Sequence, residues 1–255
     1  MSKKFGITIL LTAIALMNVS VARAEDDHSA LESYNRAMFS FNTGVDDYVL
    51  KPVAKGYRAV TTDFIRERVR NFFENLKEPA SMINHTLQGN LKDTGVSTGR
   101  FLINSTLGLL GTFDVASGWG LSKKQTGLDE TLATWCMPDG PFVVLPIFGP
   151  STPRAAVGLA GDLAAEPLTW GPYYVHFSHD AERYAFYYGL SALGFVSLRE
   201  KNLELLDNLT ANSVDAYTTI KSAYMQNRLK LNVCADKNAE PASYDFDFDE
   251  EFEDE

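Results

Sequence analysis

The sequence predicts an all-α protein with one main domain, and three observations lead to this prediction. Apolar residues recur at every third or fourth position through most of the chain, which is the spacing of one helix face. No alternating apolar and polar run reaches a useful strand length. The chain has 255 residues and is 45% hydrophobic, which suits a globular protein with one core. We therefore expect one helical domain over residues 25–235, between a leader of residues 1–24 and a tail of residues 236–255.

The leader has the pattern of a cleaved secretory signal peptide. Lys3 and Lys4 are followed by a largely apolar, uncharged run over residues 5–21, and Ala22-Arg23-Ala24 fits the small-x-small cleavage rule. An uncleaved membrane anchor is the alternative, but the run is short for a spanning helix, and no later run reaches the roughly 18 residues that spanning requires. No cysteine lies near the cleavage site. We therefore expect an exported protein without an N-terminal lipid anchor.

The first half of the domain is expected to begin with two strongly amphipathic helices. In residues 31–48 one apolar stripe is formed by Leu31, Tyr34, Met38, Phe41, Val45 and Tyr48, and Pro52 then allows a new helix to begin. A second helix is expected from residue 63, with Asp63 as its N-cap, until Glu78-Pro79 ends it and begins a further segment that runs to Gln88-Gly89. Six glycines in residues 94–120 predict short, broken helices there.

The second half is expected to be helical outside one proline-rich loop. A short helix capped by Thr126 and stopped by Pro138 precedes that loop, and a helix from Pro153 to Glu166 follows it, with the proline in its first turn. An aromatic-rich helix over residues 180–194 and one or two helices over residues 199–233 complete the domain.

The proline-rich loop of residues 138–153 combines two features that rarely occur together. It holds five of the ten prolines, which exclude it from a helix interior or a central strand, and its apolar residues include Phe142, Val143, Val144, Leu145, Ile147 and Phe148. Such a loop can belong to the protein core. It also fits the interfacial layer of a membrane, where irregular backbone is tolerated if protein covers it or if it lines a wet cavity. The second interpretation predicts an opening lined by this loop and the glycine-rich segment.

The charge is concentrated at the C-terminus. The chain has a net charge of −10, and residues 236–255 hold ten acidic residues and one lysine. This composition predicts a disordered tail that either docks a basic partner or keeps the protein soluble. Nucleic acid is a poor partner for so acidic a chain. The candidate docking residues are Asp245, Asp247, Asp249, Glu250 and Glu251.

The sequence contains no recognisable catalytic constellation. There is no GxSxG motif and no phosphate-binding glycine loop. His176 and His179 form only a weak HxxH pattern, and Cys136 and Cys234 can be a disulfide in an oxidising compartment or two separate thiols. We therefore expect no metal, no cofactor and no enzymatic activity, with a secreted lipid hydrolase as the least favoured alternative.

Four blocks together identify a family resemblance. "YNRAMFSFNTGVDDYVLKPVAKGYR", "VRNFFENLKEPASMINHTLQGN", "RFLINSTLGLLGTFDVA" and "GPFVVLPIFGPSTPR" occur in this order, and over residues 34–167 the chain resembles the MlaA (VacJ) family of Gram-negative outer-membrane proteins. The resemblance implies a ring-like domain of amphipathic helices, broken by Gly- and Pro-rich loops, around a central channel in the inner leaflet of the outer membrane. It further implies association with trimeric porins. Through the channel, misplaced phospholipids would pass from the outer leaflet to a soluble periplasmic carrier, which maintains lipid asymmetry.

The resemblance also implies roles for particular residues. Phe39, Phe41 and Asn42 would belong to a membrane-facing, channel-controlling helix, and the channel surroundings would include Phe142, Val143, Val144, Leu145, Pro146, Ile147, Phe148 and Gly149. Cys136 stands where the resemblance leads us to expect a small residue such as glycine. The alternative function is a periplasmic scaffold or binding protein for the porin or the carrier, without translocation activity of its own.

Overall fold

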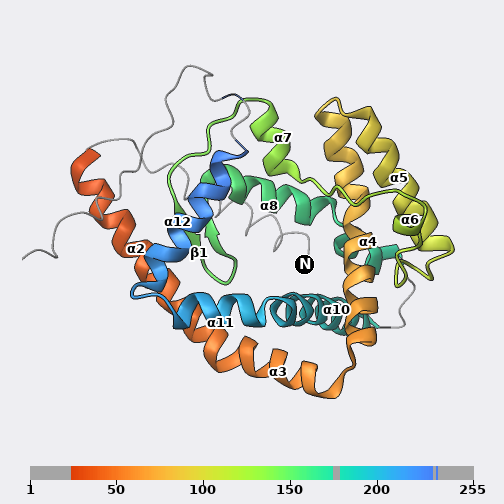
Figure 1. Cartoon of the computed structure of the whole chain (residues 1–255), viewed down its shortest axis with the longest axis horizontal. Helices are drawn as coiled ribbons and strands as arrows, with labels where there is room; N and C mark the ends of the chain where they lie inside the picture. Colours follow the sequence, from red (N-terminus) through yellow and green to blue (C-terminus); the bar gives the residue numbers. More distant parts are fainter. Residues whose placement is uncertain (1–23, 175–178, 232–233, 235–255) are drawn as a thin grey trace, which may run out of the picture.

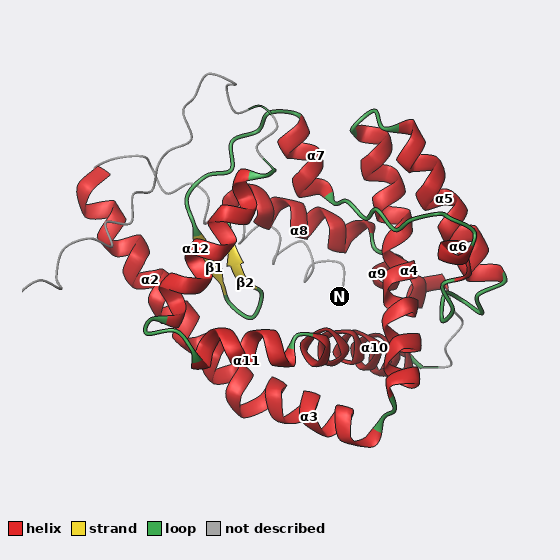
Figure 2. Ribbon diagram, viewed as in Figure 1, coloured by secondary structure: helices red, strands yellow, loops and turns green. Residues whose placement is uncertain are grey.

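The computed structural model describes residues 24–174, 179–231 and 234, and it confirms the all-α class. Figure 1 shows the helices arranged around an open centre, and Figure 2 shows one small sheet beside them. The elements before the sheet are α2 (Ala24–Val45), the π-helical turn η2 (Asp46–Leu50), α3 (Lys51–Val60), α4 (Asp63–Leu87), α5 (Leu91–Thr106), α6 (Val115–Gly118) and α7 (Leu128–Thr134). After β1 (Val143–Leu145) and β2 (Gly149–Ser151) come α8 (Pro153–Ala165), α9 (Pro167–Tyr174), α10 (Asp180–Lys201), α11 (Leu203–Ala211) and α12 (Ala216–Leu229).

The first helix does not stop before Pro52 as predicted. Val45 and Leu50 both have right-handed helical dihedrals, so α2 passes through η2 into α3 without a break. The carboxylate of Asp46 accepts hydrogen bonds from Nε and Nη2 of Arg199, over 2.6 and 2.8 Å. This bidentate pair ties the π-helical turn to α10 across the molecule.

The apolar stripe predicted along α2 packs on the protein only in part. Tyr34, Phe41 and Tyr48 are 42%, 50% and 87% exposed, whereas Asn35 is buried. Met38 of the stripe packs against the core, together with Phe39, which lies off the stripe. The periodicity identified the apolar stripe, but it could not show which of its residues contact the core and which are exposed.

Three predictions about α4 and α5 were wrong. Thr62, not Asp63, is the N-cap of α4, and the helix continues through Pro79 to Leu87. Proline removes one N–H from the helix ladder, but α4 is held beside α5 by the buried pair of Glu78 and Arg100, whose Oε1 and Nε atoms are 3.0 Å apart. The glycines of residues 95 and 99 do not break α5, which is regular to Thr106. Tertiary packing therefore overrides both local signals.

The glycine-rich segment turns tightly only after α5. Leu109 and Leu110 have φ values of 50° and 59°, a left-handed region that non-glycine residues rarely occupy. Gly111, with φ of 88°, lies against Asn75, and a Cβ at this glycine would be 2.4 Å from that side chain. The turn therefore needs glycine here, while its two leucines are 65% and 71% exposed.

The proline-rich loop is a short antiparallel hairpin, which the sequence did not predict. Val143 pairs with Ser151, Val144 with Pro150 and Leu145 with Gly149, and residues 146–148 form the turn. Within the described residues the sheet has only these two strands. Both are edge strands, so Pro150 can lie in one of them with its nitrogen turned away from the ladder.

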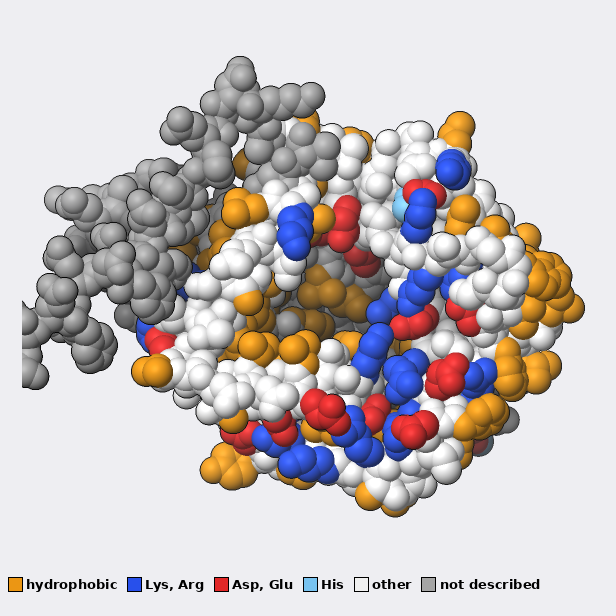
Figure 3. Space-filling model, viewed as in Figure 1, with side chains coloured by type: hydrophobic (Ala, Val, Ile, Leu, Met, Phe, Trp, Pro, Cys, Tyr) orange, Lys and Arg blue, Asp and Glu red, His pale blue; other side chains and the backbone are white. Residues whose placement is uncertain are grey.

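The interior of the domain is polar rather than apolar. Among the described residues, nine hydrophobic side chains and eighteen polar or charged side chains are buried, and four of the nine apolar ones are alanine. Large hydrophobic side chains are exposed on most elements instead. Figure 3 shows hydrophobic side chains on the outer edge and within a hollow at the centre of this face. Since soluble domains normally bury Leu, Ile, Val and Phe, this distribution indicates that water is not the only surrounding medium.

Candidate functional site

The hairpin of residues 142–151 extends towards the open centre, where Figure 2 shows its turn. Its base belongs to the core: Phe142 is 7% exposed, Val144 is fully buried, and both pack with Tyr217 of α12. Its tip reaches the opposite side, where the ring of Phe148 lies 6.3 Å from that of Phe195 in α10. The hairpin therefore spans from the α2–α12 side to α10.

Asn35 of α2 holds the base of the hairpin. Its Nδ2 atom donates to the carbonyl of Phe142 over 2.9 Å, and its Oδ1 atom accepts from the N–H of Val144 over 2.8 Å. Asn35 is only 2% exposed. Its amide therefore satisfies two backbone groups of β1 that would otherwise be buried without partners.

Asn42, two helical turns later on the same face of α2, holds the tip in the same way. Its Nδ2 atom donates to the carbonyl of Leu145 over 2.8 Å, and its Oδ1 atom accepts from the N–H of Ile147 over 2.7 Å. Ile147 has φ of 69°, an uncommon conformation for a β-branched residue. Asn42, which we expected near the channel because of the family resemblance, thus fixes the backbone of the hairpin turn.

The residues predicted to face lipid or the channel separate into two groups. Phe41, Ile147 and Phe148 are 50%, 59% and 48% exposed, and Pro146 is exposed as well. Val143, Leu145 and Gly149 are half-buried. Phe142 and Val144 are buried in the core, and the ring of Phe39 lies 5.6 Å from that of Tyr217. These last three residues pack at the base of the hairpin, where Phe142 and Val144 are buried and Phe39 is half-buried.

The C-terminal helix α12 is fastened to the hairpin side by a buried ionic cluster. Arg228, 5% exposed, donates to the carboxylates of Asp129 and Asp139, including 2.8 Å from its Nε to Oδ2 of Asp139. Arg154 belongs to the same cluster, because its Nε atom donates to Oδ1 of Asp129 over 3.0 Å. Burial by itself lowers the pKa of Arg228, but the hydrogen bonds with the two aspartates outweigh burial and raise it. The guanidinium therefore stays charged.

The sequence analysis did not identify this cluster. Arg228 lies at helical spacing from Tyr217 and Tyr224, whose side chains pack on the core. This spacing was the one feature of the sequence that could have indicated a buried arginine. A disulfide between Cys136 and Cys234 lies at the end of the same helix, which settles the alternative left open by the sequence. Cys136 has φ of 60°, a conformation that favours glycine, which explains why a small residue is expected there.

A second charged group lies on α3, α4 and α10. Glu200 is 3% exposed, and its carboxylate accepts from Nε of Arg58 over 2.8 Å and from Nη1 of Arg70 over 3.4 Å. Nε of Arg66 lies 3.3 Å from the same carboxylate. Three guanidinium groups therefore share one buried carboxylate, and Figure 3 shows basic side chains gathered beside the hollow.

The remaining predicted features give no site in the described part of the chain. No group of three or more His, Cys, Asp or Glu residues there could hold a metal ion. His179 contacts Glu182, while His176 and the acidic residues Asp245, Asp247, Asp249, Glu250 and Glu251 lie outside the described residues, as does the predicted signal peptide. No described helix is long and apolar enough to cross a bilayer.

The chain is similar to several known proteins. It is 37% identical over 198 residues to a protein of Rickettsia typhi, across 77% of this chain and 75% of that one. The intermembrane phospholipid transport system lipoprotein MlaA of Haemophilus influenzae is 35% identical over 247 residues, which cover 91% of this chain and 92% of that protein. The protein of the same name from Escherichia coli is 32% identical over 200 residues, or 77% and 75% of the two chains.

A solved structure and a family model agree with these relatives. The chain resembles a solved structure with a TM-score of 0.63 and 32% sequence identity, and the match covers 79% of this chain and 98% of that one. That structure is described as the structural basis for maintenance of bacterial outer membrane lipid asymmetry. The sequence model of the MlaA lipoprotein family matches residues 27–231. The match includes α2, the hairpin and α12, on which the geometry described above depends. This chain therefore belongs to the MlaA family.

Proposed function

We propose that the protein is the outer-membrane component of an intermembrane phospholipid transport system. It removes misplaced phospholipids from the outer leaflet through an amphipathic channel at its centre and passes them to a periplasmic carrier, which maintains lipid asymmetry. The observation that carries this proposal is the distribution of polarity, because the described domain buries polar side chains and exposes large apolar ones. Such a surface is stable against acyl chains, while the polar interior can stay hydrated.

The mechanism requires no covalent chemistry, and we propose that the protein is not an enzyme. Acyl chains would pass along the hydrophobic side chains of the hollow, and the charged group around Glu200 would offer a polar track to the headgroup. The hairpin tip, with Ile147 and Phe148 exposed, would contact the passing lipid. The downstream carrier would supply direction by taking up the product.

The location proposed for the domain is the inner leaflet of the outer membrane, beside a trimeric porin. Exposed apolar residues on η2 and α3, such as Tyr48 and Val60 at 87% and 81% exposure, suit this position. We propose that these faces and porin contact help to hold the domain there. The acidic tail of residues 236–255 would dock the carrier.

The transport proposal is tested in cells that lack the native protein. The variants Phe41→Glu and Ile147→Glu place charges on exposed residues, so the fold should persist, and we expect phospholipid to accumulate in the outer leaflet. Lys92→Glu, at an exposed position at the start of α5, is the matched control and should behave as wild type. Wild-type surface phospholipid levels in both apolar-site variants would contradict the proposal.

Reconstitution separates transport from the scaffold alternative. Purified protein in porin-containing vesicles should transfer labelled phospholipid to the carrier, whereas a scaffold would associate with porin and transfer none. Removal of residues 236–255 should weaken carrier binding while porin association persists. Unchanged carrier affinity would rule out the docking role of the tail.

A further inference from the structure

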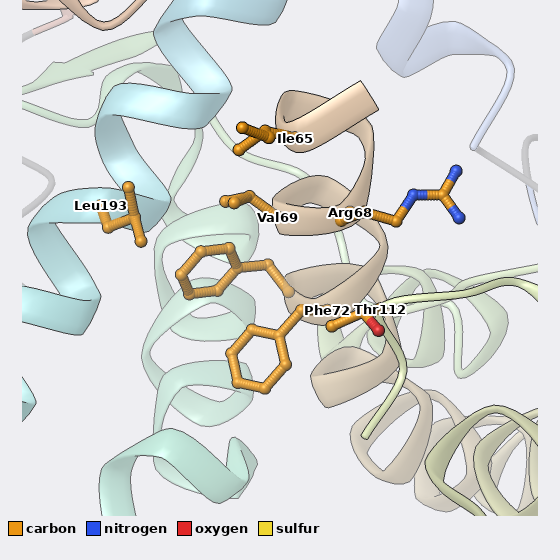
Figure 4. Close-up of a pocket in the computed structure, with 7 residues that line it drawn as sticks. Ile65, Arg68, Val69, Phe72, Thr112 and Leu193 are labelled. Atoms are coloured by element: carbon orange, nitrogen blue, oxygen red, sulfur yellow. The ribbon is translucent and has the colours of Figure 1, made fainter. Parts of the chain in front are cut away.

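A separate cavity lies in the wall of the domain, between α4 and α10 and beside the turn that follows α5 (Figure 4). Its volume is about 220 Å³, and the lining exposes no polar atom to the interior of the cavity. The lining residues are Ile65, Arg68, Val69, Phe72, Phe73, Thr112 and Leu193. The cavity is open to the surroundings, and its apolar walls favour contact with hydrocarbon over contact with water.

Arg68 gives the cavity a charged edge. Figure 4 shows its aliphatic stem beside the cavity and its guanidinium group pointing away from it. The guanidinium carbon lies 4.9 Å from the ring centre of Phe64 and 4.6 Å from that of Phe113. Its charged partner is the neighbouring Glu67, which is half exposed, and its Nε atom is buried without a hydrogen-bond partner. A guanidinium group therefore lies at the edge of an apolar cavity, with its aliphatic stem along the cavity wall.

The surface around the cavity is apolar as well. Phe64 and Ile65 are 59% and 46% exposed at the start of α4, and Leu109 and Leu110 project from the strained turn. Several N–H groups of the turn have backbone partners, since Leu110 N–H bonds to Ser105 over 3.1 Å and Gly111 N–H bonds to Asn104 over 2.8 Å. These bonds lower the cost of placing the turn against acyl chains.

We propose that this cavity binds the carbonyl-proximal part of one acyl chain of a phospholipid, so that the phosphate lies outside the cavity beside Arg68. The inference rests on the proposed transport function and adds to it a binding site in the wall, apart from the hairpin and the central hollow. The occupant combines a hydrocarbon chain with an anion, which matches an apolar lining that has one guanidinium at its edge. A protein partner would offer apolar side chains but would not require the phosphate.

The test is photo-crosslinking with the full-length protein in vesicles of phosphatidylglycerol that carries a diazirine in the carbonyl-proximal part of one acyl chain. Mass spectrometry should place adducts on residues 65–73 or on Leu193. The cavity-filling variants Val69→Phe and Leu193→Phe should reduce these adducts at least about tenfold, which corresponds to about 1.4 kcal/mol of binding. Leu198→Phe, at a 55% exposed position of the same helix, should leave them unchanged.

The phosphate contact is tested separately. Arg68→Gln should lower adduct formation with the phospholipid but not with a diacylglycerol of the same chains, because only the phospholipid carries the anion. Circular dichroism checks that every variant is folded. Lipid uptake without adducts in the lining, or adducts unchanged by Val69→Phe and Leu193→Phe, would overturn this inference and leave the transport proposal standing. Failure of the wild type to take up any phospholipid would contradict both.

Discussion

The Oδ1 atom of Asn42 accepts a hydrogen bond from the backbone N–H of Ile147 over 2.7 Å. This contact joins residues 105 positions apart and holds the hairpin turn to α2 at the edge of the hollow. Asn35 makes the corresponding pair of bonds at the base, where both partners are buried. One helix face therefore fixes both ends of β1, with an exposed contact at the tip and a sealed one at the base.

Asn42→Ala should loosen the tip without unfolding the protein. The change removes the partners of Leu145 and Ile147, both at the accessible end of the hairpin, so we expect a loss of about 1–2 kcal/mol in the free energy of unfolding. Hydrogen exchange at the Ile147 amide should become roughly tenfold faster or more. The Val144 amide, held by Asn35, is the internal control and should keep its protection. Equal acceleration at both amides would show that the two contacts are not independent.

Asn35→Ala should cost more than Asn42→Ala. It leaves the carbonyl of Phe142 and the N–H of Val144 unsatisfied inside the core, and each such group costs about 1–3 kcal/mol. Urea unfolding followed by tryptophan fluorescence measures the difference. A smaller loss than that of Asn42→Ala would mean that water reaches the base of the hairpin.

Arg228→Met should strongly destabilise the attachment of α12. The carboxylates of Asp129 and Asp139 would remain buried without their main partner, and breaking such a pair costs roughly 3–5 kcal/mol. Thermal unfolding should show the loss. The combined variant Arg228→Met with Asp139→Asn should recover part of it, because Asp129 keeps Arg154 as its partner and the second carboxylate is no longer charged.

The disulfide between Cys136 and Cys234 should contribute substantially to stability. It spans 98 residues, and constraining an unfolded loop of this size is worth roughly 2–5 kcal/mol. Cys136→Ser should therefore lower the urea midpoint. A reducing agent should lower the midpoint of the wild type by the same amount and leave that of the variant unchanged. A variant that still responds to the reductant would indicate another cause.

The contribution of Asp215 should depend on pH. Hydrogen bonds from the hydroxyl and N–H of Thr218, and the ion pair with Arg36, lower the pKa of Asp215 from 3.8 to about 2. A carboxyl whose pKa is depressed by folding stabilises the protein above its unfolded pKa, and this contribution is lost as pH falls through its folded pKa. Asp215→Asn keeps a capping oxygen but cannot ionise. The difference in unfolding free energy between wild type and variant should therefore be constant above about pH 5 and shrink towards pH 2. A constant difference down to pH 2 would contradict this assignment.

Local periodicity was enough to predict the helical class and the position of most helices. The four long sequence blocks were enough to identify the family. The helix from Pro153 and the aromatic-rich helix at residue 180 were predicted close to their observed starts. Local signals failed where distant contacts dominate. Pro79 lies within α4, whose polar face is buried against α5.

The sequence could not show which apolar residues lie in the core and which are exposed, because this depends on tertiary contacts. Phe142 and Ile147 are five residues apart in one apolar segment, yet Phe142 packs against Tyr217 of α12 and Ile147 is exposed at the tip of the hairpin. Alternation along the hairpin, and the two asparagines that hold it, decide this outcome, and both depend on contacts more than 100 residues apart. The hydrophobicity of a side chain can be seen in the sequence. Its burial depends on which residues pack against it, and these contacts form only when the chain folds.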